Sequence, residues 1–537
     1  MRPLPLALAV AVLLSACQPN SPHTPGATAP TSPNAAPAFA FTEATVLDLQ
    51  RKMTSGSLSS HAVVQAYLDR IAALDDAGPH LDAVIELNPD ALKDADRLDA
   101  ERKAGKVRGP LHGIPVLLKD NIDALPMANS AGSLALANHH PKDDAYLVRK
   151  LRIAGAVILG KTNLSEWANF RSPNSSSGWS GRGGQTKNPY VLDRSPCGSS
   201  AGTGSAIAAN FAAVGIGTET DGSIICPAAV AGLVGLKPTV GLVSRSGIIP
   251  ISLSQDSAGP MTRSVADAAA LLTAIDGADG SDPASSGRPA AAPIDYTTHL
   301  NADALKGARI GVVRKLMGYQ PDTDAAMERA ISALKAAGAT VVDAQIPTLG
   351  QWDASESVLL HYEFKAGLND YLVRSRAPLR SLADVIAYNS QHADTEMPYF
   401  GQETFVLAQT KGALTDKAYL DARDKTRRLA GPEGIDAALN AQQLDALVAP
   451  AMSPAWPIDL IKGDHFVGAG YGPAAAARYP SLTVPMGQVH GLPVGIVFMG
   501  TAWSEPRLIE LGYAFEQATR ARKPPQFLPT VAFPARN

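Results

Sequence analysis

GIGTETDGSI (residues 215–224) predicts a buried strand that ends in a turn of small residues and presents Ser223. Consecutive backbone N–H groups in such a turn can point at one spot, which is what an oxyanion hole requires. An ordinary β-turn with Asp221 and Gly222 in their usual places is the alternative interpretation. The stretch alone leaves both open, so its meaning depends on the rest of the chain.

Further short apolar runs have the character of buried strands, and helical patterns such as 145–154 and 265–275 lie between several of them. This alternation predicts an α/β fold, a mixed β-sheet covered by helices on both faces. Apolar content is continuous from Phe41 to the C-terminus, which favours a single large domain. The predicted strands are 114–118, 156–160, 212–217, 309–313, 340–342, 447–449 and 494–498. Thr45 with Asp48, and Ser59 or Ser60, are candidate caps of the first two helices.

A second segment, GIPVLLKDN (residues 113–121), places Lys119 at the end of an apolar strand. Burying an ammonium group is costly unless it is paired or neutral. Desolvation lowers the pKa of a lysine and makes the amine available as a base. A side chain that extends from the strand end into solvent is the alternative.

A third segment, CGSSAGTGS (residues 197–205), combines small residues with two adjacent hydroxyls, Ser199 and Ser200. Small residues let backbones approach closely and leave hydroxyls unhindered. The segment lacks the Lys-Ser/Thr end with which a phosphate loop reaches phosphate and metal. A turn that opens a helix, with Ser199 or Ser200 as its cap, is the structural alternative.

Lys119, Ser199 and Ser223 occur in this order, with spacings of 80 and 24 residues, and the arrangement resembles the amidase signature family. The resemblance covers nearly everything from Phe41 onward. It extends to flanking motifs at 161–163 with Glu166, 235–239, 257–263 and 482–485.

The resemblance implies a Ser-Ser-Lys triad and the hydrolysis of carbon–nitrogen amide bonds without a metal or cofactor. Ser223 would be the acyl-forming nucleophile, Ser199 would relay its proton, and Lys119 would be the base. Backbone N–H groups of Thr220, Asp221, Gly222 and Ser223 would bind the oxyanion, and Ser200 would remain a helix cap.

The chain departs from the usual family pattern beside these residues. Cys197 and Ala201 replace glycine or serine, and Ile225 stands where most members carry arginine. The run at 220–227, TDGSIICP, is most similar to that of bacterial peptide amidases, which implies release of ammonia from C-terminal peptide amides. A broad aliphatic or aryl amidase, the amidase-like component of a glutamyl-tRNA amidotransferase and an inactive binding scaffold are the alternatives.

The N-terminus predicts export. Arg2, an apolar run at 4–14 and small residues before Cys17 form a signal peptide over 1–16, of the lipoprotein type. Lipidation of Cys17, a disordered Pro/Ala/Ser/Thr-rich tether over 17–40 and a catalytic domain over 41–537 would follow. A periplasmic protein held by a lipid anchor, with the outer membrane slightly favoured, is the expectation, and an ordinary secretory signal is the alternative.

The composition of the chain limits the kinds of molecule that it is expected to bind. A net charge of −3 offers no basic surplus for nucleic acid, so we expect a small-molecule or short peptide amide as substrate. No Cys/His cluster has metal-ligand spacing. The chain has 3 cysteines, and with Cys17 lipidated, Cys197 and Cys226 remain. They could form a disulfide in an oxidising compartment, but two buried free thiols are the prediction because both lie in the candidate active-site segment.

Overall fold

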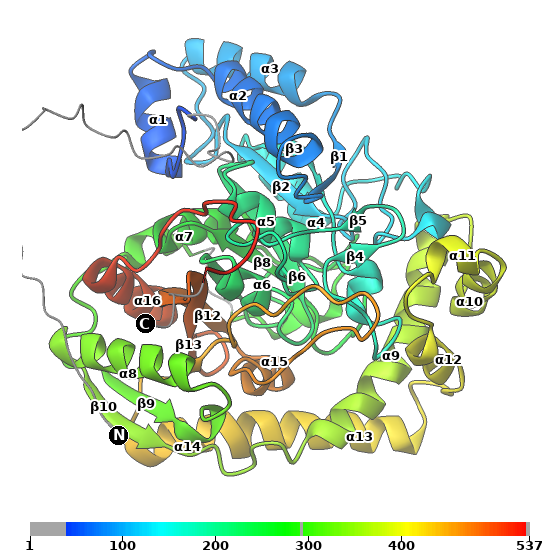
Figure 1. Ribbon diagram of the computed structural model, residues 1–537, viewed down its shortest axis with the longest axis vertical. Helices are drawn as coiled ribbons and strands as arrows, with labels where there is room; N and C mark the ends of the chain where they lie inside the picture. Colours follow the sequence, from blue (N-terminus) through cyan, green and yellow to red (C-terminus); the bar gives the residue numbers. More distant parts are fainter. Residues whose placement is uncertain (1–38, 290–293, 533–537) are drawn as a thin grey trace, which may run out of the picture.

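The computed structural model describes residues 39–289 and 294–532 (Figure 1). The strands are β1 (Val84–Leu87), β2 (Pro115–Lys119), β3 (Val157–Thr162), β4 (Trp179–Ser180), β5 (Gly184–Gln185), β6 (Val214–Glu219), β7 (Val234–Lys237), β8 (Ser257–Thr262), β9 (Arg309–Val313), β10 (Thr340–Ala344), β11 (Ala446–Pro450), β12 (Ser481–Val489) and β13 (Leu492–Met499). The α-helices are α1 (Val46–Thr54), α2 (Ser60–Ile71), α3 (Ala91–Lys103), α4 (Tyr146–Ile153), α5 (Ala201–Ala208), α6 (Ile225–Val230), α7 (Val265–Ile275), α8 (Pro321–Ala336), α9 (Asp353–Arg374), α10 (Leu382–Gln391), α11 (Ala393–Glu396), α12 (Glu403–Gln409), α13 (Lys417–Ala430), α14 (Ala437–Gln442), α15 (Gly472–Ala477) and α16 (Glu505–Thr519).

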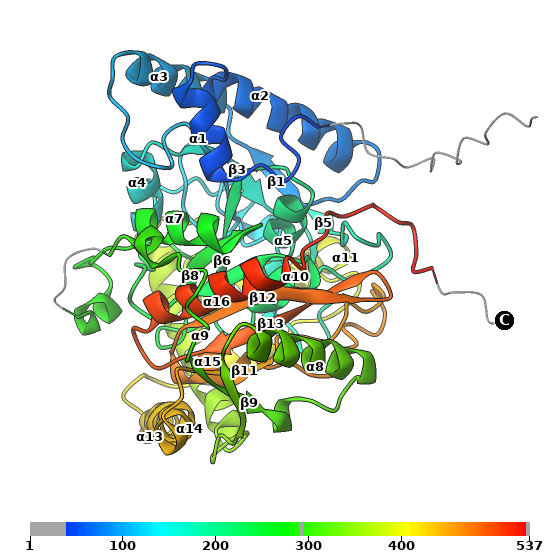
Figure 2. The ribbon, with the colours of Figure 1, turned by 90° about the vertical axis from the view of Figure 1, so that its left-hand side faces the viewer.

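One 11-stranded sheet runs through the molecule in the order β1-β3-β2-β6-β8-β7-β12-β13-β11-β9-β10. The sheet is mixed, since β2 pairs in parallel with β3 and β6, whereas β6 pairs antiparallel with β8. Helices α1 to α3 lie beside the β1–β3 end, and α8 and α14 lie near β9 and β10 at the other end (Figures 1 and 2). The predicted mixed sheet in a single domain is confirmed.

Helices cover both faces of this sheet. The side chain of Leu482 in β12 lies against Gly512 of α16, and α8 packs beside α16 over β12 and β13 (Figure 2). The next side chain along β12, that of Thr483, lies with Ala229 of α6 over Gly495. Because successive side chains of a strand point to opposite faces, α16 and α6 lie on opposite sides of β12.

The first two helices begin where the sequence predicts. The Thr45 side chain accepts from the Asp48 N–H, and the Asp48 side chain accepts from the Thr45 N–H, which completes a capping box before α1. The Ser59 side chain caps α2 by accepting from the Ala62 N–H. Both caps satisfy backbone N–H groups in the first turns of α1 and α2.

All the predicted strands are present, but β1, β4, β5, β7, β8 and β12 were not predicted. Pro260 lies inside β8 and Pro485 inside β12, and a proline argues against a central strand because it lacks an N–H donor. The register of β12 against β13 shifts between Pro485 and Gly487, which accommodates that proline.

The predictions for residues 1–16, for Cys17 and for most of the 17–40 tether lie outside the described residues. None of the helices within 39–289 and 294–532 is long and apolar enough to cross a membrane.

Candidate active site

Lys119 is the last residue of β2 and is completely buried. Its Nζ lies 2.8 Å from Ser199 Oγ, 2.9 Å from Thr218 Oγ1 and 3.2 Å from the Thr218 carbonyl oxygen. A neutral amine donates two hydrogen bonds and accepts one, so with Thr218 as the acceptor the nitrogen lone pair is free to take a proton from the Ser199 hydroxyl. Lys119 does not extend into solvent, so that alternative is wrong.

The surroundings of Lys119 favour its neutral form. Buried Lys161 forms an ion pair with Asp120 at 3.1 Å, whereas no carboxylate within the described part of the chain pairs with Lys119. Burial lowers the pKa of Lys119 to about 7, although the negative charges of Asp256 and Glu219 act in the opposite direction. The amine is therefore available as a base near neutral pH.

The segment before α5 places the two adjacent serines differently. Ser199, which follows a cis peptide bond from Gly198, directs its hydroxyl to Lys119. Ser200 lies at the N-cap position of α5 but makes no side-chain cap, so the prediction that it caps the helix is wrong. Its Oγ donates to the Thr218 carbonyl at 3.1 Å and accepts from the Thr218 N–H at 3.2 Å. Ser200 therefore fastens this segment to β6.

Ser223 lies in the turn between β6 and α6 and is 8% exposed. Its carbonyl accepts from the Ser200 N–H at 3.2 Å, which links the two serine segments. Among the hydrogen bonds of the described residues, none uses the Ser223 hydroxyl or the backbone N–H groups of residues 220–223. Gly222 has a φ of +86°, and the ring of Tyr471 occupies the space that a Cβ would need. The turn thus offers free backbone donors and an unengaged serine hydroxyl.

Two residues that the sequence analysis missed hold this arrangement. Thr218, at the end of β6, contacts both Lys119 and Ser200 and accepts from Asn121 Nδ2 at 3.0 Å. Glu219 Oε2 accepts from the N–H groups of Ile224 and Ile225 at 2.8 and 3.0 Å and so orients the start of α6. The sequence signal for these two residues was a polar pair, Thr218 and Glu219, at the end of the apolar strand β6.

Ser199 and Ser223 line the same cavity, which has a volume of about 530 Å³. Hydroxyls of Thr218 and Thr220 lie at its wall, and the loop 248–253 supplies much of its apolar lining. A cavity of this size holds a small ligand or a short peptide end. No cluster of three or more His, Cys, Asp or Glu side chains suited to a metal occurs among residues 39–289 and 294–532.

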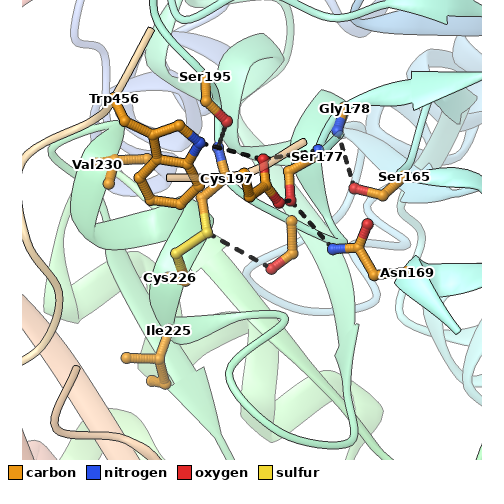
Figure 3. Close-up of a disulfide and its surroundings, with 12 residues drawn as sticks. Ser165, Asn169, Ser177, Gly178, Ser195, Cys197, Ile225, Cys226, Val230 and Trp456 are labelled. Carbon is orange, nitrogen blue, oxygen red and sulfur yellow. Dashed lines mark hydrogen bonds between the residues drawn. A yellow bond between two sulfur atoms is a disulfide. The ribbon is translucent and has the colours of Figure 1, made fainter. Parts of the chain in front are cut away.

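Cys197 and Cys226 form a disulfide, with Cα atoms 6.0 Å apart, so the prediction of two free thiols is wrong. The bond joins the segment of Ser199 to the first turn of α6, which follows Ser223. Figure 3 shows the indole of Trp456 on one side of it and the polar side chains of Ser165, Asn169 and Ser177 on the other. Free thiols were expected because both cysteines lie in the candidate active-site segment. That placement brings the two sulfur atoms together.

We expect the Cys197→Ala/Cys226→Ala variant to lose about 3–4 kcal/mol of unfolding free energy, because the bond closes a loop with a sequence separation of 29. Guanidinium denaturation measures the loss. Peptide mapping after alkylation supplies the control, since both cysteines should react only after reduction. Alkylation of either one in unreduced, denatured protein would contradict the disulfide.

The Amidase family model matches residues 62–509. The chain belongs to this family. The crystal structure of native peptide amidase from Stenotrophomonas maltophilia is 62% identical, covers 91% of this chain and 100% of its own, and superposes with a TM-score of 0.88. A probable amidase of Arabidopsis thaliana is 42% identical over 91% of this chain and 93% of its own length. A glutamyl-tRNA(Gln) amidotransferase component of Synechococcus is 34% identical over 90% of this chain and 94% of its own.

Membership of the amidase signature family, predicted from the order of Lys119, Ser199 and Ser223, is therefore confirmed. The protein is a hydrolase that acts on amides, and its fold is that of peptide amidase.

Proposed function

We propose that this amidase removes the C-terminal amide of peptides and releases ammonia, using Ser223 as nucleophile, Ser199 as relay and Lys119 as base. The observation that carries the catalytic assignment is the 2.8 Å contact between Lys119 Nζ and Ser199 Oγ, made by a buried amine that pairs with no carboxylate of residues 39–289 and 294–532. This arrangement needs no histidine, because the Ser199 hydroxyl connects the Ser223 hydroxyl to Lys119 as its base.

In the first step the Ser223 oxygen bonds to the amide carbon. Its proton passes to Ser199 Oγ, and the Ser199 proton passes to Lys119 Nζ. The negative charge on the carbonyl oxygen is held by backbone N–H groups of Thr220, Asp221, Gly222 and Ser223. When the carbon–nitrogen bond breaks, the proton returns through Ser199 to the leaving nitrogen, and ammonia departs. Water then attacks the acyl ester and gives its proton to the same relay. The bond between the acyl carbon and Ser223 Oγ breaks, the proton returns to that oxygen, and the peptide leaves as its free acid.

The substrate assignment rests on the cavity and on the relatives. A volume of about 530 Å³ with an apolar wall at 248–253 accommodates the end of a short peptide. The peptide amidase of Stenotrophomonas maltophilia shares 62% of its residues with this chain, far more than the amidotransferase component does at 34%. A peptide amide is therefore favoured over glutamine and over simple aryl amides.

Ammonia release from a blocked dipeptide amide, from glutamine and from an aryl amide tests the assignment. We expect kcat/KM for the dipeptide amide to exceed the other two by at least about 100-fold, because only it fills the cavity. The same dipeptide as a free acid and the Ser223→Ala variant are the controls. Preference for glutamine would indicate amidotransferase-like chemistry, and equal rates on all three amides would indicate a broad-specificity amidase.

We also propose that the protein is exported and held by a lipid on Cys17. The disulfide between Cys197 and Cys226 supports this location, because disulfides persist in oxidising compartments and are rare in the cytosol. Incorporation of radiolabelled palmitate, lost in Cys17→Ser, is the expected result. A mature N-terminus at Gln18 or beyond, without label, would contradict the lipid anchor.

A further inference from the structure

The carboxylate of Asp256 joins two parts of the cavity wall. Its Oδ1 accepts from Thr220 Oγ1 at 2.6 Å, and its Oδ2 accepts from the N–H groups of Ile251 and Ser252 at 2.8 and 2.9 Å. Thr220 begins the turn that leads to Ser223, whereas Ile251 and Ser252 belong to the loop that lines the cavity. One side chain thus sets the distance between the nucleophile turn and this loop.

The pairing of β6 with β8 brings the two parts together. Glu219 is the partner of Ser257 in the antiparallel ladder, so Thr220 and Asp256 are the first residues beyond it. The loop is held from its other side by Glu363 of α9, which accepts from the Ser252 hydroxyl at 2.5 Å and from the Ser254 N–H at 2.8 Å. Asp256 therefore links this loop to the nucleophile turn, residues 220–223.

The charges around Asp256 come from several elements. Lys119 lies on β2, Glu219 on β6 and Glu363 on α9, while Arg245 is paired with Asp282 at 2.6 Å. Burial raises the pKa of Asp256 to about 6, and three hydrogen bonds to the carboxylate oppose that rise. When Asp256 is ionised, its charge favours the protonated form of Lys119.

We propose that Asp256 is a positioning residue of this amidase, which holds Thr220 and the loop at 251–252 in the geometry that the oxyanion and the substrate require. The proposal rests on the acyl transfer assigned to Ser223. Asp256 itself touches no reacting atom: it acts through the Thr220 hydroxyl and through two backbone N–H groups. A misplacement of about 1 Å at such a turn is enough to cost about 100-fold in rate.

Asp256→Asn separates two effects of this group. We expect kcat to fall about 10- to 100-fold, because an amide cannot accept from the hydroxyl and from both N–H groups in the same way. We also expect the acid limb of the kcat/KM profile to move to lower pH, because the charge that raises the pKa of Lys119 is gone.

Thr220→Val removes only the hydroxyl and keeps the charge of Asp256. This variant should lose kcat as Asp256→Asn does, but its acid limb should stay in the wild-type position. Thr220→Ser keeps the hydroxyl and should retain most of the activity. Asp267→Asn is the matched control, since Asp267 of α7 is a buried carboxylate outside the cavity. It accepts a hydrogen bond from the Val46 N–H, with a length of 2.9 Å. It should change neither kcat nor the pH profile.

Labelling by a fluorophosphonate distinguishes this proposal from the one on which it rests. Wild-type protein that is not labelled at Ser223 would overturn the catalytic assignment itself. Wild-type labelling, together with unchanged kcat and an unshifted acid limb in Asp256→Asn, would overturn the positioning role alone. An equal loss of kcat in Asp267→Asn would also overturn it, because the effect would then be one of general stability.

Discussion

Ser223→Ala should lower amide hydrolysis by at least about 10⁴-fold while leaving the fold intact, since removal of a serine nucleophile leaves only binding and oxyanion stabilisation. The Ser223 hydroxyl takes part in none of the hydrogen bonds of the described residues, so its loss leaves no partner unsatisfied. We expect the free energy of unfolding to change by less than about 1 kcal/mol. Steady-state ammonia release and guanidinium denaturation measure the two quantities separately.

Fluorophosphonate labelling should disappear in the same variant, because the probe requires an activated serine oxygen. Ser205→Ala is the matched control: Ser205 lies on α5, and its hydroxyl donates to the Lys187 carbonyl at 2.7 Å outside the cavity. That variant should remain labelled and active. Substantial turnover by purified Ser223→Ala would exclude Ser223 as the nucleophile.

The strands that the sequence predicted are those whose short runs consist mostly of apolar residues. β9 has the predicted bounds, and β2 and β3 differ from the prediction by one or two residues. β8 and β12 were missed because Pro260 and Pro485 break their apolar runs, and their place in the sheet depends on pairing with β6 and β13. Such pairing is a property of the tertiary structure, which local periodicity cannot express.

The candidate site shows the same division. Lys119, Ser199 and Ser223 were selected as candidates from their order and spacing, but the contacts of Thr218 and the link made by Asp256 depend on how β6 lies beside β2 and β8. The disulfide between Cys197 and Cys226 was an open alternative in the sequence, but free thiols were expected because both cysteines lie in the candidate active-site segment. Sequence spacing could not decide the question, because it does not show that the two segments meet.

Lys119→Met should reduce kcat by about 10³-fold at pH 7.5, because a positioned general base contributes about 10²- to 10⁴-fold. The base acts only when neutral, and burial lowers its pKa to about 7. Wild-type kcat/KM should therefore fall as the pH drops below about 7, and this acid limb should vanish in the variant. A pH series of ammonia release on the dipeptide amide measures both effects.

Lys119→Arg distinguishes a base from a mere positive charge. Arginine remains protonated at any working pH, so it preserves a cation but cannot accept the Ser199 proton. We expect it to be as inactive as Lys119→Met. Lys237→Met is the matched control, since Lys237 is also completely buried, its pKa is lowered to about 8, and it lies on β7 outside the cavity. Its acid limb should be that of wild type.

The pH dependence of the unfolding free energy gives an independent measure of proton binding by Lys119. Unfolded Lys119 is protonated below its ordinary pKa, whereas the folded protein binds that proton only below about 7. The unfolded state therefore binds more protons between these values, and the protein loses stability as the pH falls through this range. Lys119→Met removes that cost and should be more stable than wild type at pH 6. Equal or lower stability, or activity in Lys119→Arg, would mean that Lys119 is charged in the folded enzyme and that another group accepts the proton.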